Sequence, residues 1–570
     1  MKLNQEIIIT TVQLLVGKYN FQKQFIDKMI DSFGLTDCEK TLNKTFTINQ
    51  KLKLILDAQG SLIFVGSSTT NIEIRKRIIE KWEDSAINVA FLKWGRTNGH
   101  SRSHKIRVLS ELRWHSGKNW ANAFIDIGGF DKVFTGLANE SKKSKFEDIE
   151  PIIKLPELKD FQIELKSALI ATLREKGNEA KCMISLPTGG GKTRTAVEAY
   201  IEWLQPRFSE GKFLIWLAQS EELCEQAIAS FSQVWSSKEY TESLRIYRFF
   251  GSNAFDLDDL NGGVIVCSIQ KLYNAVIADT EFCQEIISNC GALIIDEAHR
   301  ATTAMYEKLY EYSQKLNGEV MFPICGLTAT PGRNGETYKL SELFQSKLYT
   351  PTLGPEYNEN PLRYFREHEY LAVPIHKIVN TNCDIDDISI DENLDNDEIK
   401  EDLEKFFKRT LNKKLATDIN RNIKIISTLT QIEKGQQTLV YACTVEHAVY
   451  LSSIMNFIGR SAVVVSSDTR KPLRRKYIEQ FKKGEIEFIF NYGVLTTGFD
   501  APKTENIVIC RPTFSDVLYE QIVGRGLRGP KFGGTAYCTI IDFCDNYFRF
   551  GDQQAYKRFQ DSWLKKSAEN

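Results

Sequence analysis

The segment Leu186-Pro187-Thr188-Gly189-Gly190-Gly191-Lys192-Thr193 places three consecutive glycines between a short apolar run at 182–184 and a helical pattern that starts at Thr195. Glycine has no Cβ atom, so successive backbone N–H groups can converge on phosphate oxygens. In such a loop Lys192 reaches the β- and γ-phosphates, and the Thr193 hydroxyl holds Mg²⁺. We expect the nucleotide to be held by Thr188, Gly189, Gly190, Gly191, Lys192 and Thr193.

This loop departs from the strict phosphate-loop pattern, which has glycine where the chain has Leu186. Alone, it is also compatible with a tight glycine turn in an unrelated enzyme. A second motif, Asp296-Glu297-Ala298-His299, follows the apolar run 291–295, which is typical of a buried parallel strand. We expect Asp296 to hold Mg²⁺ through water and Glu297 to polarise the attacking water. Together, the two motifs predict an ATP hydrolase.

Length and composition indicate a folded protein of several domains. The chain has 570 residues, which exceeds what one hydrophobic core usually organises. Its 73 Lys and Arg residues balance 74 Asp and Glu residues, so any grip on nucleic acid must come from local patches. The 12 cysteines form no Cys-x-x-Cys pair and read as reduced core residues. We expect a cytoplasmic protein that does not enter a membrane.

The alternation of apolar and helical segments predicts two α/β domains in tandem. Apolar runs at 213–217, 264–267, 292–295 and 323–327 alternate with helical patterns, and a second series runs from 438 to 509. The expected domains are an α+β N-terminal accessory domain, a first α/β domain, an acidic interdomain segment and a second α/β domain. Their expected bounds are 1–145, 146–375, 376–420 and 421–570. We interpret the acidic segment as a solvated hinge rather than a partner site.

Further motifs resemble those of superfamily 2 helicases, in the group with type III restriction-enzyme translocating subunits, UvrB and XPB-type proteins. The resemblance covers about residues 158–546 and implies two RecA-like doubly wound parallel-sheet domains behind a smaller α+β domain. Leu158-Lys159-Asp160-Phe161-Gln162 is similar to the family's adenine-reading segment, in which Gln162 reads the base. Leu327-Thr328-Ala329-Thr330-Pro331 is similar to the coupling motif, with Thr328 and Thr330 as its hydroxyls.

Two motifs of the second α/β domain complete the resemblance. Segment 491–502 is similar to the fifth motif, which implies that Gly498 and Asp500 lie near the nucleotide and Thr496 near the phosphodiester backbone. Segment 521–528 matches the sixth motif, with Arg525 and Arg528 three positions apart on one helix face. Guanidinium groups fork onto phosphate oxygens, so the resemblance implies that these arginines reach ATP across an interdomain cleft.

The resemblance also implies contacts to nucleic acid from hydroxyl and amide groups at strand ends. The candidates are Ser220, Ser268, Gln270, Thr444 and Thr496. Each is also compatible with a helix cap or turn residue. By analogy with the DNA-tracking group we expect double-stranded or forked DNA as the partner and leave RNA open.

The N-terminal segment supports several interpretations. Basic and aromatic residues interleave from Phe91 to Lys118, which is compatible with a nucleic-acid surface or with a solvated face anchored by tryptophans. An expected hairpin at 53–66 with Arg75 faintly resembles GIY-YIG nucleases but lacks their tyrosines. We therefore expect an ATP- and Mg²⁺-dependent helicase or translocase, whose N-terminal domain targets DNA or binds protein partners. The alternatives are an ATP-switched clamp and a helicase–nuclease fusion.

Overall fold

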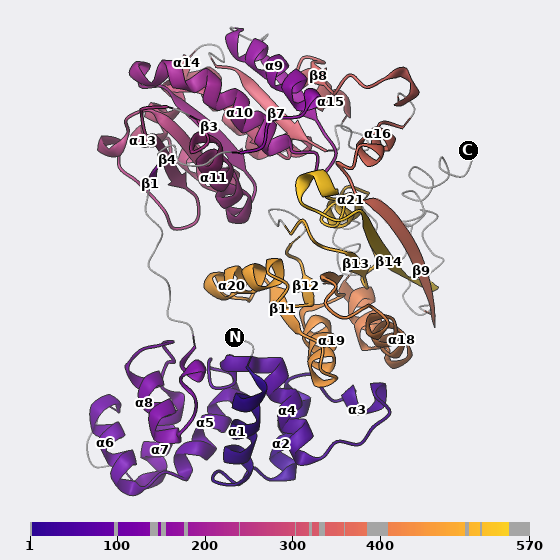
Figure 1. Ribbon diagram of the computed structural model, residues 1–570. Coiled ribbons are helices and arrows are strands. Elements are labelled where there is room, and N and C mark those ends of the chain that lie inside the picture. Colours follow the sequence, from indigo (N-terminus) through magenta and orange to yellow (C-terminus); the bar gives the residue numbers. More distant parts are fainter. Residues whose placement is uncertain are drawn as a thin grey trace, which may run out of the picture.

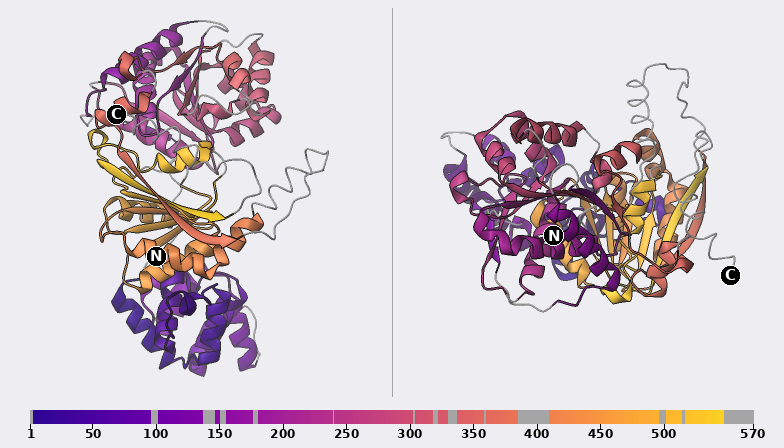
Figure 2. Two further views of the ribbon diagram at one scale, coloured as in Figure 1. Left: turned by 90° about the vertical axis from the view of Figure 1, so that its right-hand side faces the viewer. Right: turned by 90° about the horizontal axis from the view of Figure 1, so that it is seen from above.

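The computed structural model in Figure 1 has three parts: two α/β lobes and a helical N-terminal domain. The described residues are 3–95, 101–136, 146–149, 155–175, 180–238, 240–301, 304–317, 322–329, 337–357, 360–384, 409–495, 501–513 and 516–546. The second lobe lies between the first lobe and the N-terminal domain in Figure 1 and in the turned view of Figure 2.

The first lobe is built on an eight-stranded sheet with the order β1-β4-β5-β3-β6-β7-β2-β8. All neighbouring strands are parallel except β1 and β4. The strands are β1 Phe146–Ile149, β2 Lys181–Ser185, β3 Phe213–Ala218, β4 Leu244–Phe249, β5 Gly263–Ser268, β6 Cys290–Asp296, β7 Ile324–Thr328 and β8 Leu348–Tyr349. The strands predicted from the apolar runs are confirmed.

Helices cover both faces of this sheet because alternate strand side chains point to opposite sides. Leu214 and Trp216 of β3 belong to one apolar cluster and Phe213 and Ile215 to another. On the first face lie α9 Asp160–Arg174, α10 Lys192–Leu204 and α11 Glu221–Trp235. On the second lie α12 Ile269–Ile277, α13 Glu281–Ser288, α14 Ala304–Asn317 and α15 Thr337–Leu343. The predicted doubly wound architecture is therefore observed.

The second lobe has a six-stranded parallel sheet with the order β11-β12-β10-β13-β14-β9. Its strands are β9 Val373–Asp384, β10 Thr438–Tyr441, β11 Ala462–Ser466, β12 Phe488–Tyr492, β13 Asn506–Ile509 and β14 Tyr537–Asn546. Its helices are α18 Ile419–Thr430, α19 Val445–Phe457, α20 Lys471–Lys482 and α21 Asp516–Val523. Helix α16, Pro361–Glu367, precedes the connection into this lobe.

The structure has a strand, β9, where the sequence predicted the start of the acidic interdomain segment at residue 376. Val373–Asp384 pairs with β14 in the second sheet. The acidic residues that suggested a hinge begin only at Asp384, whereas Ile375 and Ile378 supply a strand pattern ahead of them. Residues 385–408 lie outside the described residues.

The N-terminal domain is helical, so the predicted α+β character and the hairpin at 53–66 were wrong. Its helices are α1 Gln5–Val16, α2 Lys23–Ser32, α3 Cys38–Thr41, α4 Ile48–Gln59, α5 Thr69–Glu80, α6 Asp84–Trp94, α7 Arg102–Glu111 and α8 Asn119–Gly128. Thr47 and Gln50 form a capping box that starts α4. The apolar residues Leu52, Ile55 and Leu56 then face the core at helical spacing.

The N-terminal domain packs on the second lobe, although the first lobe follows it in sequence. Helix α4 lies along α19, and one apolar cluster runs from the N-terminal helices into α18, α19 and the second sheet. Figure 2 shows the N-terminal helices against this side of the second lobe. None of the described helices combines the length and apolarity needed to cross a membrane.

Candidate nucleotide site between the two lobes

The glycine loop joins the carboxyl end of β2 to the first residue of α10. Gly189 and Gly191 have φ angles of +88° and +85°, in the left-handed region that glycine adopts without strain. A Cβ atom on Gly191 would overlap the Gln162 side chain. The N-terminus of α10 therefore opens toward the loop, where backbone N–H groups and the helix dipole favour an anion.

Leu186, the departure from the strict pattern, has a structural explanation. Its side chain is buried in the core of the first lobe, and its backbone N–H donates to Thr328 O at 3.2 Å. The Lys192 ammonium donates to Leu186 O, also at 3.2 Å. The leucine side chain anchors the start of the loop in the core, while the backbone N–H and carbonyl of residue 186 link the loop to β7 and to Lys192.

Gln162 lies under the loop at the start of α9 and is buried. Its amide nitrogen donates to Gly190 O at 3.3 Å, and its amide oxygen accepts from Lys159 N–H at 2.9 Å. The side chain thus links the segment expected to read adenine with the glycine loop.

Asp296 ends β6 beside the loop and is almost completely buried. Burial, with Glu297 adjacent, raises its pKa to about 7, although Lys192 and Arg525 oppose the shift. Burial lowers the pKa of Lys192, and the same two carboxylates partly offset that effect. The site therefore places a buried lysine beside two carboxylates, with an arginine of the other lobe close enough to act on both.

Glu297 begins a chain of polar contacts that leads to Thr328. Glu297 has a φ of +51°, which is uncommon for a residue with a side chain. Its Oε2 lies 3.4 Å from His299 Nδ1, and the same nitrogen lies 3.4 Å from Thr328 Oγ1. The residue expected to activate water is thereby connected to the predicted coupling motif.

The second lobe meets the loop through the segment that follows α21. A Cβ atom on Gly524 would lie 2.6 Å from Thr188 Cβ, and one on Gly189 would lie 3.5 Å from Arg528 Cγ. Arg525 Nε donates to Gln521 O at 3.2 Å, which continues the turn of α21. The two lobes therefore touch at the glycine loop, and both arginines line the same cleft as Lys192 and Asp296.

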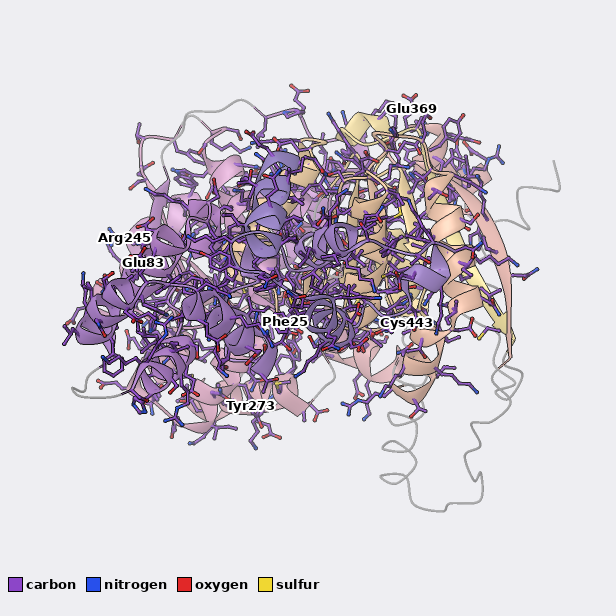
Figure 3. The ribbon with its side chains drawn as sticks, turned by 90° about the horizontal axis from the view of Figure 1, so that it is seen from below. Phe25, Glu83, Arg245, Tyr273, Glu369 and Cys443 are labelled. Carbon is purple, nitrogen blue, oxygen red and sulfur yellow. The ribbon has the colours of Figure 1, made fainter. Side chains whose placement is uncertain are left out.

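Sequence reasoning missed the connection between the lobes, which lies beside the site. Leu371 pairs with Arg528, and Ala372 N–H donates to Leu527 O at 3.0 Å. Lys531 N–H donates to Glu369 O at 3.1 Å; Glu369 is labelled in Figure 3. No recognisable motif marks these residues, because their role depends on backbone pairing rather than on side-chain chemistry.

A cluster of aromatic rings at this connection links α9, the helix that carries Gln162, to the second lobe. The Phe161 and Tyr370 ring centroids lie 5.2 Å apart, and those of Tyr370 and Phe532 lie 5.5 Å apart. Phe532 and Gln162 both line the cleft, which has a volume of about 1520 Å³. The cleft thus offers an aromatic surface next to the amide expected to read a base.

The described residues predicted to contact nucleic acid lie at or near helix starts, where they make local hydrogen bonds or precede a helix. Ser220 and Thr444 cap α11 and α19, accepting from Leu223 N–H at 3.3 Å and His447 N–H at 3.1 Å. Ser268 precedes α12 and is nearly buried, and Gln270 donates to Asn274 Oδ1 at 3.4 Å. Four other predicted residues lie outside the described residues: Thr330, Thr496, Gly498 and Asp500.

The nuclease alternative loses its structural basis. The expected hairpin is α4 followed by a short 3₁₀ turn, and Arg75 is buried in the helical domain. The Arg75 guanidinium donates to the backbone carbonyls of Ser110, Phe64 and Gly66 at 2.7–2.9 Å. It holds helices together rather than facing a substrate.

The fold and this cleft define a P-loop protein with two RecA-like lobes. The family model for the type III restriction enzyme res subunit matches residues 155–333, and that for the helicase conserved C-terminal domain matches residues 420–529. The chain therefore belongs to the superfamily 2 helicases, in the group related to the type III res subunit.

Two relatives and one solved structure illustrate the similarity. The putative ATP-dependent helicase IRC3 of Saccharomyces cerevisiae is 27% identical over 68% of this chain, which spans about half (51%) of that relative. The type I restriction enzyme EcoKI endonuclease subunit of Escherichia coli is 24% identical over 65% of the chain and 33% of its own length. The structure of S. cerevisiae Dbp5 bound to RNA and ADP BeF3 aligns with 71% of this chain and 92% of its own, with 14% identity and a TM-score of 0.45.

Proposed function

We propose that the protein is an ATP- and Mg²⁺-dependent superfamily 2 motor that acts on nucleic acid. The observation that supports this most strongly is the convergence of three motifs on one cleft. The glycine loop with Lys192, the carboxylates of Asp296 and Glu297, and the arginines of segment 525–528 all line it. Two of these motifs come from the first lobe and one from the second, as a cleft that closes on ATP requires.

The roles follow from the chemistry of each group. Lys192 and the loop N–H groups bind the β- and γ-phosphates, and Arg525 and Arg528 stabilise the charge of the transferred phosphoryl group. Glu297 polarises the attacking water. Gln162, with Phe532 nearby, reads the adenine. In the second lobe, Gly498 and Asp500 are proposed to complete the nucleotide site by resemblance alone.

The residues fit a bound Mg²⁺ ion. The raised pKa of Asp296 reflects a buried carboxylate next to a second one, an environment that a divalent cation relieves. Thr193 and Asp296 would hold the ion, which would supply positive charge that neutralises the ATP phosphates.

The path from Glu297 through His299 to Thr328 supports coupling between hydrolysis and nucleic-acid binding. Thr328 lies at the carboxyl end of β7, and Thr330 follows it in the sequence motif. Movement of Thr328 on nucleic-acid binding would change the position of His299 and hence of Glu297. The contacts to nucleic acid are assigned to Ser220, Ser268, Gln270, Thr444 and Thr496.

We propose DNA, double-stranded or forked, as the polymer. The support is the resemblance to restriction-enzyme subunits in both the family match and the Escherichia coli relative. We further propose that residues 1–145 form an accessory domain. The two lobes are proposed to extend over the expected α/β ranges, with β9 added to the second lobe. The proposed location of the protein is the cytoplasm.

The test is ATP hydrolysis measured with duplex, forked and single-stranded DNA and with RNA, each at several salt concentrations. We expect the strongest stimulation by duplex or forked DNA and a steep loss with salt, because phosphate contacts release counterions. Equal rates with and without every polymer would contradict the proposal. Displacement of a triplex strand in the presence of ATP separates a translocating motor from a clamp that closes without moving.

A further inference from the structure

The loop between α7 and α8 places an arginine, a histidine and a lysine at the edge of the interlobe cleft. Arg113, His115 and Lys118 are exposed and line the cleft. Between them, Trp114 is buried, and its indole N–H donates to Thr135 O at 3.1 Å. Gly117 N–H donates to the same carbonyl at 3.2 Å, so the loop is held at two points.

This loop is joined to the second lobe beside α20. Arg470 Nη1 donates to Ser116 Oγ at 2.7 Å, which connects the loop to the residue that precedes the helix. Arg475 and Lys482 of α20 also line the cleft. We call this combined surface the basic wall. It consists of Arg113, His115, Lys118, Arg470, Arg475 and Lys482.

The basic wall belongs to one packed unit because the N-terminal domain is docked on the second lobe. The Tyr450 hydroxyl of α19 donates to Asp37 O at 3.2 Å and contacts the Thr41 hydroxyl. The Phe46 and Phe457 ring centroids lie 4.7 Å apart, and Lys53 Nζ lies 5.4 Å from the Phe457 ring centroid. The basic wall is therefore carried by the second lobe.

On the first lobe, helix α11 contributes three acidic residues to the cleft. They are Glu221, Glu222 and Glu225. Arg474 of α20 pairs with Glu222, so that arginine is already engaged across the cleft. A polyanion in this cleft would lie against the basic wall and away from α11. Figure 1 shows α11, α20 and the N-terminal helices around this side of the molecule.

We propose that the basic wall binds the phosphate backbone of the nucleic acid on which the motor acts. The long cationic side chains of its arginines and lysines suit phosphate contacts that do not read sequence. The wall would hold the polymer at the edge of the interlobe cleft and move with the second lobe when the cleft opens and closes. This inference rests on the proposed function and gives the N-terminal domain a role in gripping the polymer.

The test compares two double variants of the full chain. Arg113→Gln/Lys118→Gln removes two charges from the basic wall, and Lys23→Gln/Lys28→Gln removes two exposed charges from α2, outside the cleft. Binding to a fluorescent duplex is measured by anisotropy at several salt concentrations without ATP. The plot of log binding constant against log salt should become shallower by about 1.8 in the wall variant only. The α2 variant, whose substitutions lie outside the cleft, should hydrolyse ATP without polymer at the wild-type rate.

The outcomes separate the two proposals. An unchanged affinity and salt slope in the wall variant, with wild-type hydrolysis still stimulated by the polymer, would contradict nucleic-acid binding by the basic wall. The proposed motor function would not be affected. A wild-type protein that binds neither DNA nor RNA would overturn both. Equal losses in the wall and α2 variants would show a general charge effect and would likewise overturn the specific site.

Discussion

Gly524 of the second lobe packs directly on Thr188 of the glycine loop. A Cβ atom at position 524 would lie 2.6 Å from Thr188 Cβ and 2.9 Å from Glu520 O. Both distances are shorter than real Cβ contacts allow, so the approach of the two lobes at the nucleotide site requires glycine here. The backbone that presents Arg525 can reach the loop only because this side chain is missing.

Gly524→Val should therefore separate the lobes at the loop and slow ATP hydrolysis. Overpacking typically costs 1–3 kcal/mol, so a loss of about 10-fold in the maximal rate is expected. Steady-state ATPase assays measure it. Ala536→Val, which enlarges an exposed residue of the same lobe, is the control and should leave the rate unchanged. Equal rates for both variants would show that the lobes need not approach at this point.

Glu297→Gln should keep nucleotide binding while hydrolysis falls by about 10² to 10⁴, the usual contribution of a general base. The amide retains the size of the side chain but cannot accept a proton from water. Binding of a fluorescent ATP analogue and single-turnover hydrolysis together separate the two effects. Normal turnover in this variant would remove Glu297 from the assigned role.

The docking of the N-terminal domain predicts coupling between Phe46 and Phe457. Their rings are in contact across the interface, and such pairs contribute about 0.5–1.5 kcal/mol beyond burial. A double-mutant cycle with Phe46→Leu and Phe457→Leu, followed by urea unfolding, should give an interaction energy in this range. Strictly additive effects would indicate that the two rings do not meet in solution.

His447 predicts a loss of stability in mild acid. Cys443 N–H donates to its Nδ1 at 3.2 Å, and its Nε2 lies 3.0 Å from Asn422 Oδ1, which fits a neutral ring; Cys443 is labelled in Figure 3. Burial, with Arg421 nearby, lowers the pKa of His447 to about 3. Since the unfolded chain binds the proton near pH 6.5, folding becomes less favourable as the pH falls below that value.

This linkage is measured by urea unfolding at pH 7 and pH 5. One titrating histidine contributes about 2 kcal/mol over this interval. His447→Asn should reduce the difference in unfolding free energy between the two pH values, whereas His115→Asn, at an exposed position, should not. The same pH difference in wild type and His447→Asn would contradict the neutral buried ring.

The sequence predicted the two α/β lobes and the nucleotide motifs because their patterns are local. Buried parallel strands appear as apolar runs such as 213–217, and the glycine loop stands beside its own strand and helix. The helical N-terminal domain was mistaken for α+β because the apolar run at 53–56 is too short for its periodicity to separate a strand from a helix. The capping box of Thr47 and Gln50 was the signal that could have corrected it.

Other features depend on contacts between distant segments and leave no pattern in the sequence. The pairing of Leu371 with Arg528 is of this kind, as is the docking of α4 on α19. Leu186 shows the opposite case: it breaks a motif, yet its burial explains the exception.

The most direct test of the account is ATP hydrolysis by Arg525→Ala, measured with nucleotide binding in the same samples. The account requires charge from the second lobe to reach ATP held by the first, and an arginine in this role typically contributes 10³ to 10⁵ in rate. It predicts a loss of at least about 10³-fold with ATP still bound. Hydrolysis at the wild-type rate would contradict catalysis at the junction of the two lobes.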